Sequence, residues 1–202
     1  DSANISLDIL TTRDIGQAES LSDKLEQLNT IRRNLSTKGI KLANDLVENN
    51  NLIKDPAFFL YNADWHPGIL GLIAGRLSEK YGKPVVAACL DVTNIRASVR
   101  GPNGYEVLQG LIDTKINFIK IGGHSQAAGF TIHSSDVDTF KDQFVEAIQN
   151  QQVDSPGVDP VEYECEITLS DINKDNIKFF KSMEPFGRAN PQPIFLSRQL
   201  NV

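Results

Sequence analysis

The chain has 202 residues and a formal net charge of −6, with 40% hydrophobic and 23% charged residues. This composition is typical of a globular protein, and no apolar run approaches the roughly 20 residues that cross a bilayer. The net charge argues against a uniformly basic nucleic-acid coat protein but permits a local basic groove, since phosphate binding depends on where the charges lie.

A long amphipathic helix is predicted over 14–49, after a segment, 1–12, that resembles the tail of an upstream element. Four leucines recur every seven residues, Leu21, Leu28, Leu35 and Leu42, and Leu25 and Leu46 lie beside them on the same helix face. Such spacing forms an apolar seam along one face, and we expect Thr11 to cap the start. The pattern leaves two interpretations open, a helix packed on its own domain and a rigid connector between domains.

Residues 51–150 are predicted to form a layered α/β domain. The expected elements are strands 57–62, 84–91, 95–100 and 127–133 and helices 68–81, 105–117 and 137–150. Helical spacing directs these side chains inward: Ile69, Leu72, Ile73, Leu77, Val107, Leu108, Leu111 and Ile112. Strands that alternate with helices favour a mostly buried β-sheet flanked by helices.

A linker is predicted at 151–160, which is polar and contains two prolines and a glycine. A small α+β segment follows, with a strand over 161–169, a short helix over 176–183, a turn-rich loop over 184–193 and a strand from 194. The first residues lack the basic start and apolar core of a signal peptide. Because the chain starts at Asp1 and ends in an apolar-rich segment, we expect it to be part of a longer protein.

The two cysteines, Cys89 and Cys165, lie in strand-like runs. We expect both to be small buried hydrophobic residues in a reducing compartment rather than members of a disulfide or a metal site. A cytoplasmic protein without a membrane partner is therefore expected.

Two loops have the composition of anion-binding sites. Trp65 and His66 lie between a predicted strand and a helix, where free backbone N–H groups point outward, and Pro67 suits the first helical turn. They are either ligand contacts or a capped turn with Trp65 packed inside. Gly122 and Gly123 allow backbone amides to approach a phosphate.

The residues that follow these glycines, His124 and Ser125, supply possible donors to the same phosphate. The alternative is a tight turn with a surface histidine. Arg100, at a strand end beside a Gly-Pro-Asn-Gly turn, is able to clamp a phosphate through two hydrogen bonds. Arg76, in the preceding helix, is a second candidate cation. For each arginine, a solvated or ion-paired role is the alternative.

The sequence contains no recognisable hydrolytic centre. Its three histidines, His66, His124 and His133, lie in no cluster with metal-ligand spacing. There is no nucleophile elbow and no phosphate-binding Walker loop. We therefore expect no catalytic residue and no metal site within this chain.

Four ordered segments together resemble the DHH-associated domain of RecJ-type single-stranded-DNA exonucleases, which belong to the DHH family. They are WHPGILGLIAGRLSEKYGKP from Trp65, IRASVRGPNGYEVLQGL from Ile95, IGGHSQAAGFTI from Ile121 and EPFGRANPQPIF from Glu184. The segment from Leu21 to Arg33 is similar to the connector helix of that family.

The resemblance implies four parts: a connector helix over 1–50 from an absent catalytic domain, a substrate-binding domain over 51–150, a linker over 151–160 and the start of an OB-fold from 161 to 202. It further implies that manganese or magnesium is held in the absent domain. Single-stranded DNA is the implied partner, with other repair or replication proteins as further partners. The implied phosphate-binding residues are Arg76, Arg100, Gly122, Gly123 and His124, and the implied cleft-lining residues are Trp65, His66 and Ser125.

The chain departs from the family pattern at Val99 and Gly101, on either side of Arg100, and at Ala189. The first two changes bear on how a phosphate fits beside Arg100, and the third on loop geometry. Two other functions are left open. One is a related phosphoesterase that acts on oligoribonucleotides or phosphoadenosine phosphate, and the other is a non-catalytic nucleic-acid-binding relative in a replication assembly.

Overall fold

The computed structural model describes residues 2–151, 161–187 and 189–198. Residue contacts divide the chain into two compact units, Asp1–Gly157 and Val158–Val202. The predicted linker falls almost wholly on 152–160, outside the described residues, so the division into four parts stays a prediction.

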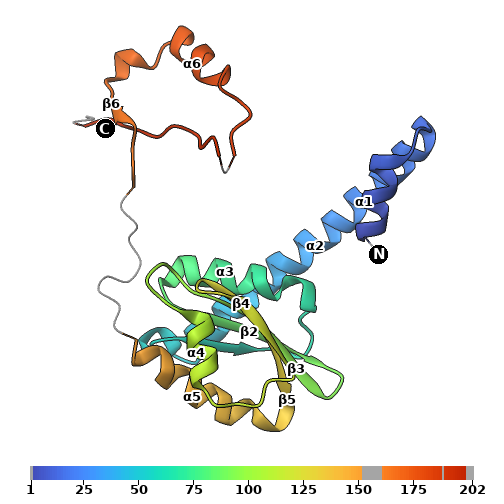
Figure 1. Ribbon diagram of the computed structural model, residues 1–202, viewed down its shortest axis with the longest axis vertical. Helices are drawn as coiled ribbons and strands as arrows, with labels where there is room; N and C mark the ends of the chain where they lie inside the picture. The colour runs from blue at the N-terminus through green and yellow to red at the C-terminus, as the bar shows by residue number, and fades with distance from the viewer. Residues whose placement is uncertain (1, 152–160, 188, 199–202) are drawn as a thin grey trace. The chain divides into compact units, whose positions relative to one another are not determined.

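A five-stranded sheet forms the centre of the first unit, in the order β1-β2-β3-β5-β4 (Figure 1). Its strands are β1 (Phe58–Tyr61), β2 (Val85–Asp91), β3 (Asn94–Arg100), β4 (Lys120–His124) and β5 (Ala127–His133). Strands β1 and β2 are parallel, and all other neighbours are antiparallel. The last hairpin therefore places β5 between β3 and β4.

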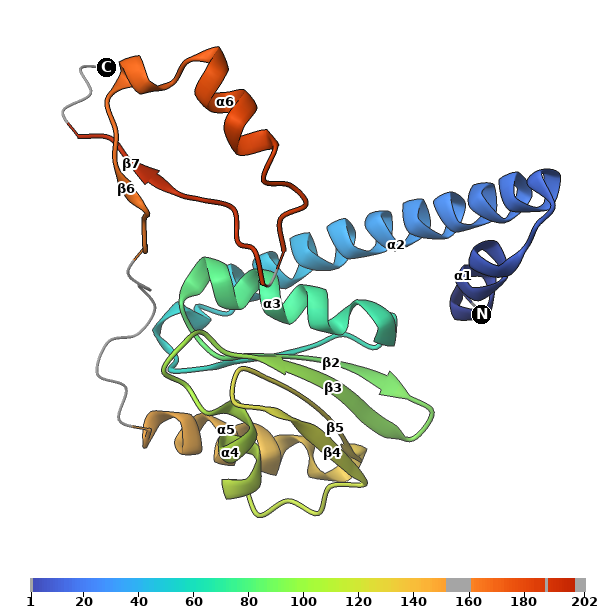
Figure 2. The same cartoon turned by 45° about the horizontal axis from the view of Figure 1, so that its top comes forward.

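Helices cover both faces of this sheet. The helical elements of the first unit are α1 (Ser2–Thr11), α2 (Ile15–Asn49), η1 (Leu52–Lys54), η2 (Pro67–Ile69), α3 (Leu70–Tyr81), α4 (Val107–Asp113), η3 (Ser134–Asp136) and α5 (Val137–Gln149). Figure 2 shows α2 and α3 on one face of the sheet and α4 and α5 on the other. The predicted layered α/β class, with a buried sheet between helices, is confirmed.

The alternation of side chains along the strands produces two apolar cores. In β2, Val85, Ala87 and Cys89 pack against α2 and α3, whereas Val86 and Ala88 pack toward α4 and α5. Both faces of β2 are thus buried, which explains its continuous apolar run. In β3 only Ile95, Ala97 and Val99 enter a core. The alternate residues of β3 are polar, and they face the side of the sheet that carries α3.

The long predicted helix is present as α2, but its leucine seam is largely uncovered. Leu28, Leu35 and Leu42 are 41%, 40% and 38% exposed, so the predicted apolar seam is not buried along its length. The buried positions are instead Leu21, Gly39, Ala43 and Val47. Gly39 lies so close to α3 that a Cβ there would stand 2.8 Å from Cδ1 of Ile73. Only the last third of α2 therefore packs closely on the sheet domain.

The start of the chain also differs from expectation. Residues 1–12 were expected to be a tail, but α1 is a helix that packs back on α2. The cap of α2 is Asp14 and not Thr11, because the Asp14 carboxylate accepts a hydrogen bond from Gln17 N at 2.9 Å. Beyond the sheet domain α2 extends as a rod with α1 against it (Figure 1), which favours the connector interpretation.

Several side chains depart from the predicted burial. Leu72 and Ile112 are 40% and 55% exposed because each lies just outside the buried stripe of its short helix. Cys89 is buried as predicted, and burial, reinforced by nearby Asp91, raises the pKa of its thiol. Cys165 is exposed, so the expectation of burial is wrong there. Both thiols are free.

The second unit contains little regular structure. Its elements are β6 (Cys165–Glu166), η4 (Leu169–Asp171), α6 (Lys174–Lys181) and β7 (Phe195–Leu196), with β6 and β7 parallel. The predicted helix is present, but the two predicted strands shorten to two residues each within the described part of the chain. Phe180 of α6 packs on Phe195 with ring centroids 4.8 Å apart. This unit is the small α+β segment that the sequence predicts.

Candidate nucleic-acid interface

Three rows of side chains cross one face of the sheet on β3, β5 and β4. Directly opposite residues of antiparallel strands point to the same face. The register gives the rows Arg100–Ala127–His124, Ser98–Gly129–Gly122 and Arg96–Thr131–Lys120. Arg100 and His124, which are far apart in the sequence, therefore face one surface across Ala127.

This face is open because α3 lies over β2 and β3 and does not extend across β5 and β4. The result is a hollow of about 800 Å³ beside the start of α3. We call it the basic groove and define it by Gly71, Asn94, Arg96, Ser98, Arg100, Lys120, Gly122, Gly129 and Thr131. Glycines at the centre of its floor, Gly122 and Gly129, leave the backbone accessible.

The basic groove carries three cations, Arg96, Arg100 and Lys120, and its lining contains no carboxylate in the part of the chain that the structure describes. No ion pair is recorded for any of the three among those residues. A locally positive surface thus exists on a chain of net charge −6. Such a surface attracts phosphate groups whatever the net charge.

Arg100 is held in place by its own strand. Its Nη1 donates to the Ser98 hydroxyl at 3.0 Å and to the Val99 carbonyl at 2.7 Å. A Cβ at Gly71 would lie 2.8 Å from Nη2 of Arg100, so this glycine of α3 makes room for the guanidinium. Both recorded bonds use Nη1, and the remaining N–H donors of the guanidinium suit a phosphate.

The glycine pair lies in a strand, not in the loop that the sequence suggested. Gly122, Gly123 and His124 form the end of edge strand β4. Gly123 has a φ of 154°, and a Cβ there would lie 2.3 Å from the Ala127 carbonyl oxygen. Only glycine fits this position, whereas a Cβ at Gly122 would meet no atom within 4 Å.

The turn after β4 is fixed beside Arg100. The Ser125 carbonyl accepts a hydrogen bond from Val107 N at 2.7 Å, and the Gln126 carbonyl accepts one from Gly101 N at 3.0 Å. Nδ1 of His124 accepts a long hydrogen bond from Gln126 N at 3.4 Å. A neutral imidazole that accepts at Nδ1 carries its proton on Nε2, which leaves Nε2 as a donor for an anion.

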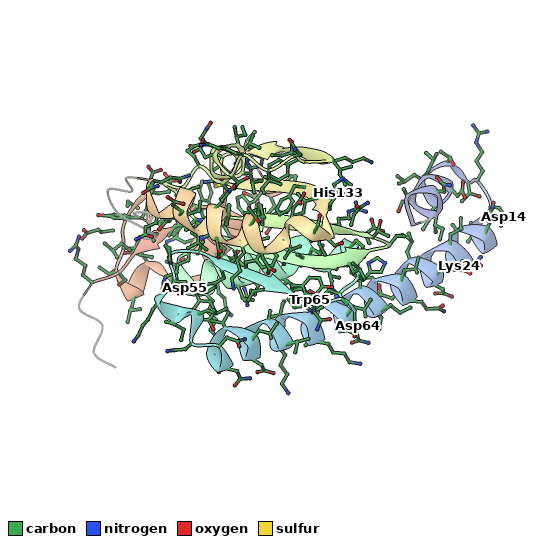
Figure 3. All side chains as sticks on the ribbon, turned by 90° about the horizontal axis from the view of Figure 1, so that it is seen from below. Asp14, Lys24, Asp55, Asp64, Trp65 and His133 are labelled. Atoms are coloured by element: carbon green, nitrogen blue, oxygen red, sulfur yellow. The ribbon has the colours of Figure 1, made fainter. Side chains whose placement is uncertain are left out.

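Trp65 is a core residue, which corrects the expectation that it lines the cleft. It is 5% exposed and packs in the core that α2 and α3 form over β1 and β2, and it lies between the sheet and α2 (Figure 3). Its Nε1 is buried with no hydrogen-bond partner among the described residues. Trp65 therefore supports the packing of α2 and does not contact the basic groove.

His66 and Arg76 also lie away from the basic groove. Nδ1 of His66 accepts a hydrogen bond from Gly68 N at 3.0 Å, and the ring borders a separate hollow beside Leu28 and other residues of α2. Arg76 is exposed, pairs with Glu79 at 3.4 Å and borders α2. The structure thus brings together Arg100, Gly122 and His124 but separates Arg76, Trp65 and His66 from them.

The prediction from sequence missed five polar residues of the groove, Asn94, Ser98, Arg96, Lys120 and Thr131. Four residues of the β3 segment, Asn94, Arg96, Ser98 and Arg100, alternate with apolar ones. That period of two indicates one polar face and was a usable signal. No local pattern singles out Lys120 or Thr131, because they join the groove only through the pairing of β5 with β3 and of β4 with β5.

Within residues 2–151, 161–187 and 189–198, no three His, Cys, Asp or Glu side chains come together as metal ligands. The described residues therefore do not fit a bound manganese or magnesium ion. Over the same ranges, no helix has both the length and the apolar character needed to cross a membrane.

Comparison with known proteins identifies two family models. Residues 54–150 match the DHHA1 domain, and residues 163–202 match the RecJ OB domain. Among curated proteins, the single-stranded-DNA-specific exonuclease RecJ of Bacillus subtilis is 26% identical over 95% of this chain and 24% of its own length. The RecJ proteins of Haemophilus influenzae and Thermus thermophilus are 26% and 28% identical over 96% of this chain, and 35% and 28% of their own lengths.

Solved structures show the same fold. The crystal structure of RecJ in complex with Mn²⁺ from Thermus thermophilus superposes with a TM-score of 0.80 at 24% identity, covering 96% of this chain and 28% of that one. The chain thus spans about a quarter to a third of the length of the relatives described above. Its residues 54–150 are thus similar to the DHHA1 domain and its residues 163–202 to the RecJ OB domain, and RecJ proteins align along nearly all of the chain.

Proposed function

We propose that this chain is the substrate-binding part of a metal-dependent 5′→3′ single-stranded-DNA exonuclease that acts in DNA repair and recombination. The observation that carries the proposal is the basic groove, which contains Arg100 and lies on the same face of the sheet as His124. The names of the relatives, single-stranded-DNA-specific exonucleases, support the same substrate. The proposal includes a cytoplasmic location and contacts with other repair or replication proteins.

The proposed role of the groove is positioning. Charge-assisted hydrogen bonds from Arg100 and His124 hold backbone phosphates and so fix the register of the strand without reading its bases. A strand that is held in register presents one phosphodiester to a hydrolytic centre, which lowers the entropic part of the barrier. The divalent metal seen in RecJ relatives would supply charge stabilisation and an activated water.

Removal of the Arg100 side chain is expected to weaken binding of single-stranded DNA by about 10- to 100-fold, because a charged hydrogen-bonding group is worth about 1.5–3 kcal/mol. Fluorescence anisotropy with a 3′-labelled oligonucleotide would measure the dissociation constants of the wild type and Arg100→Ala. Arg76→Ala removes the same charge outside the groove and is the matched control. Equal affinities of both variants for DNA would contradict the proposal.

The chain alone is expected to bind but not to hydrolyse DNA, because its described residues offer no set of metal ligands. The measurement is release of mononucleotides from a 5′-phosphorylated, 3′-labelled oligonucleotide with Mn²⁺ or Mg²⁺ present. Arg100→Ala, purified in the same way, controls for a contaminating nuclease, which would give equal release in both samples. If the wild type releases mononucleotides and Arg100→Ala does not, the chain is itself a nuclease, which contradicts this prediction.

A further inference from the structure

We propose that Arg96, Lys120 and Asn94 form a second nucleotide-binding subsite at the far end of the basic groove, which engages only strands longer than a dinucleotide. This inference rests on the proposed function and extends it along the groove. The motifs in the sequence do not indicate these three residues. They come together because β3 and β4 both pair with β5.

The cations of the subsite come from one row of the sheet. Arg96 and Lys120 both lie opposite Thr131, on the same face as Arg100 and His124. Two strand spacings, or about 10 Å, separate their backbones. Long side chains from both sides of that gap reach a group that lies above Thr131. Both side chains are exposed, and neither has a carboxylate partner among the described residues.

The separation of the rows suits a single-stranded backbone. Alternate residues of a strand are roughly 6.7 Å apart, which is close to the distance between adjacent phosphates in an extended single strand. The row of Ser98 and Gly122 lies one such step from Arg100, and the row of Arg96 lies two steps away. A phosphate at Arg100 therefore places the next one over the glycines and the third one between Arg96 and Lys120.

Asn94 gives an independent indication of a ligand at this end. It lines the groove, and its Oδ1 is buried with no hydrogen-bond partner among the described residues. A buried acceptor without a donor costs free energy. Because this oxygen has almost no contact with solvent, a rotation of the Asn94 amide would present it to the N–H donors on the base of a nucleotide held by Arg96 and Lys120.

The test compares a 5′-phosphorylated thymidine dinucleotide with the corresponding dodecanucleotide. Arg96→Ala and Lys120→Ala are each expected to weaken binding of the dodecanucleotide by about fivefold to tenfold and to lower the salt dependence by about 0.7 in the log–log slope. Neither substitution changes binding of the dinucleotide, measured by NMR titration. Arg100→Ala weakens both ligands, because its row binds the first phosphate.

Lys141→Ala is the matched control, because Lys141 is exposed on α5, which covers the opposite face of the sheet. It removes one positive charge without touching the groove, so a general electrostatic effect would weaken binding in this variant too. Equal losses for dinucleotide and dodecanucleotide, or equal losses in Lys141→Ala and Lys120→Ala, overturn the subsite. If Arg96→Ala and Lys120→Ala bind the dodecanucleotide as the wild type does and Arg100→Ala does not, the subsite is overturned but the proposed function is not. A wild type that binds neither ligand overturns the proposed function as well.

Discussion

Gly123→Ala is expected to destabilise the first unit by at least about 3 kcal/mol, and to lower its melting temperature by roughly 10 °C. Two costs combine. A φ of 154° is unfavourable for a residue with a Cβ, and the added methyl would lie 2.4 Å from Cα of Ala128 as well as 2.3 Å from the Ala127 carbonyl oxygen. Backbone atoms of the paired strand cannot move aside as a flexible side chain does. Thermal and urea unfolding followed by circular dichroism would measure the loss.

Gly122→Ala is the control for this substitution, because Gly122 is the neighbouring glycine of the same edge strand. Its added Cβ meets nothing within 4 Å, so the expected change in unfolding free energy is within about 0.5 kcal/mol. A stable Gly123→Ala protein would show that the hairpin tolerates a different backbone at this point. The turn that holds His124 beside Arg100 would then not depend on glycine.

Phe140→Ala is expected to cost about 3–5 kcal/mol of unfolding free energy, the range for truncation of a buried aromatic side chain. Phe140 is fully buried among four other rings, with centroids of Phe59, Phe118, Phe130 and Phe144 between 4.6 and 6.3 Å away. Phe130 belongs to β5, the middle strand of the basic groove. The cavity would therefore lie directly behind the strand that aligns the cations, and urea unfolding would measure its cost.

Two variants separate the effect of this cavity from a general loss of apolar surface. Phe140→Leu keeps most of the volume and is expected to lose less than half as much stability. Ile112→Ala truncates a residue of α4 that is 55% exposed, and its expected cost is below about 1 kcal/mol. Equal losses for Phe140→Ala and Ile112→Ala would contradict the placement of Phe140 at the centre of the core.

The candidate site was only partly predictable from the sequence. Arg100, Gly122, Gly123 and His124 were identified by residue type and by resemblance, and the structure places Arg100, Gly122 and His124 on one face. Arg76 was grouped with them because it belongs to the same motif-bearing helix. The rotation of α3 turns its glycines toward Arg100 and turns Arg76 toward α2, and sequence spacing without a known buried face does not fix that rotation.

The sequence by itself indicated most of the helices and strands, except α1 and β4, and the doubly buried β2, because these follow from local periodicity of apolar residues. The polar face of β3 follows from the same periodicity, although it was not used to predict the site. The sequence did not determine which surfaces those elements share. Only the tertiary structure placed β5 between β3 and β4, and so aligned Arg96 with Lys120 and Arg100 with His124. It also left the leucine seam of α2 uncovered. Both outcomes depend on pairing and packing between segments distant in the chain, where the free energy comes from contacts that no local pattern records.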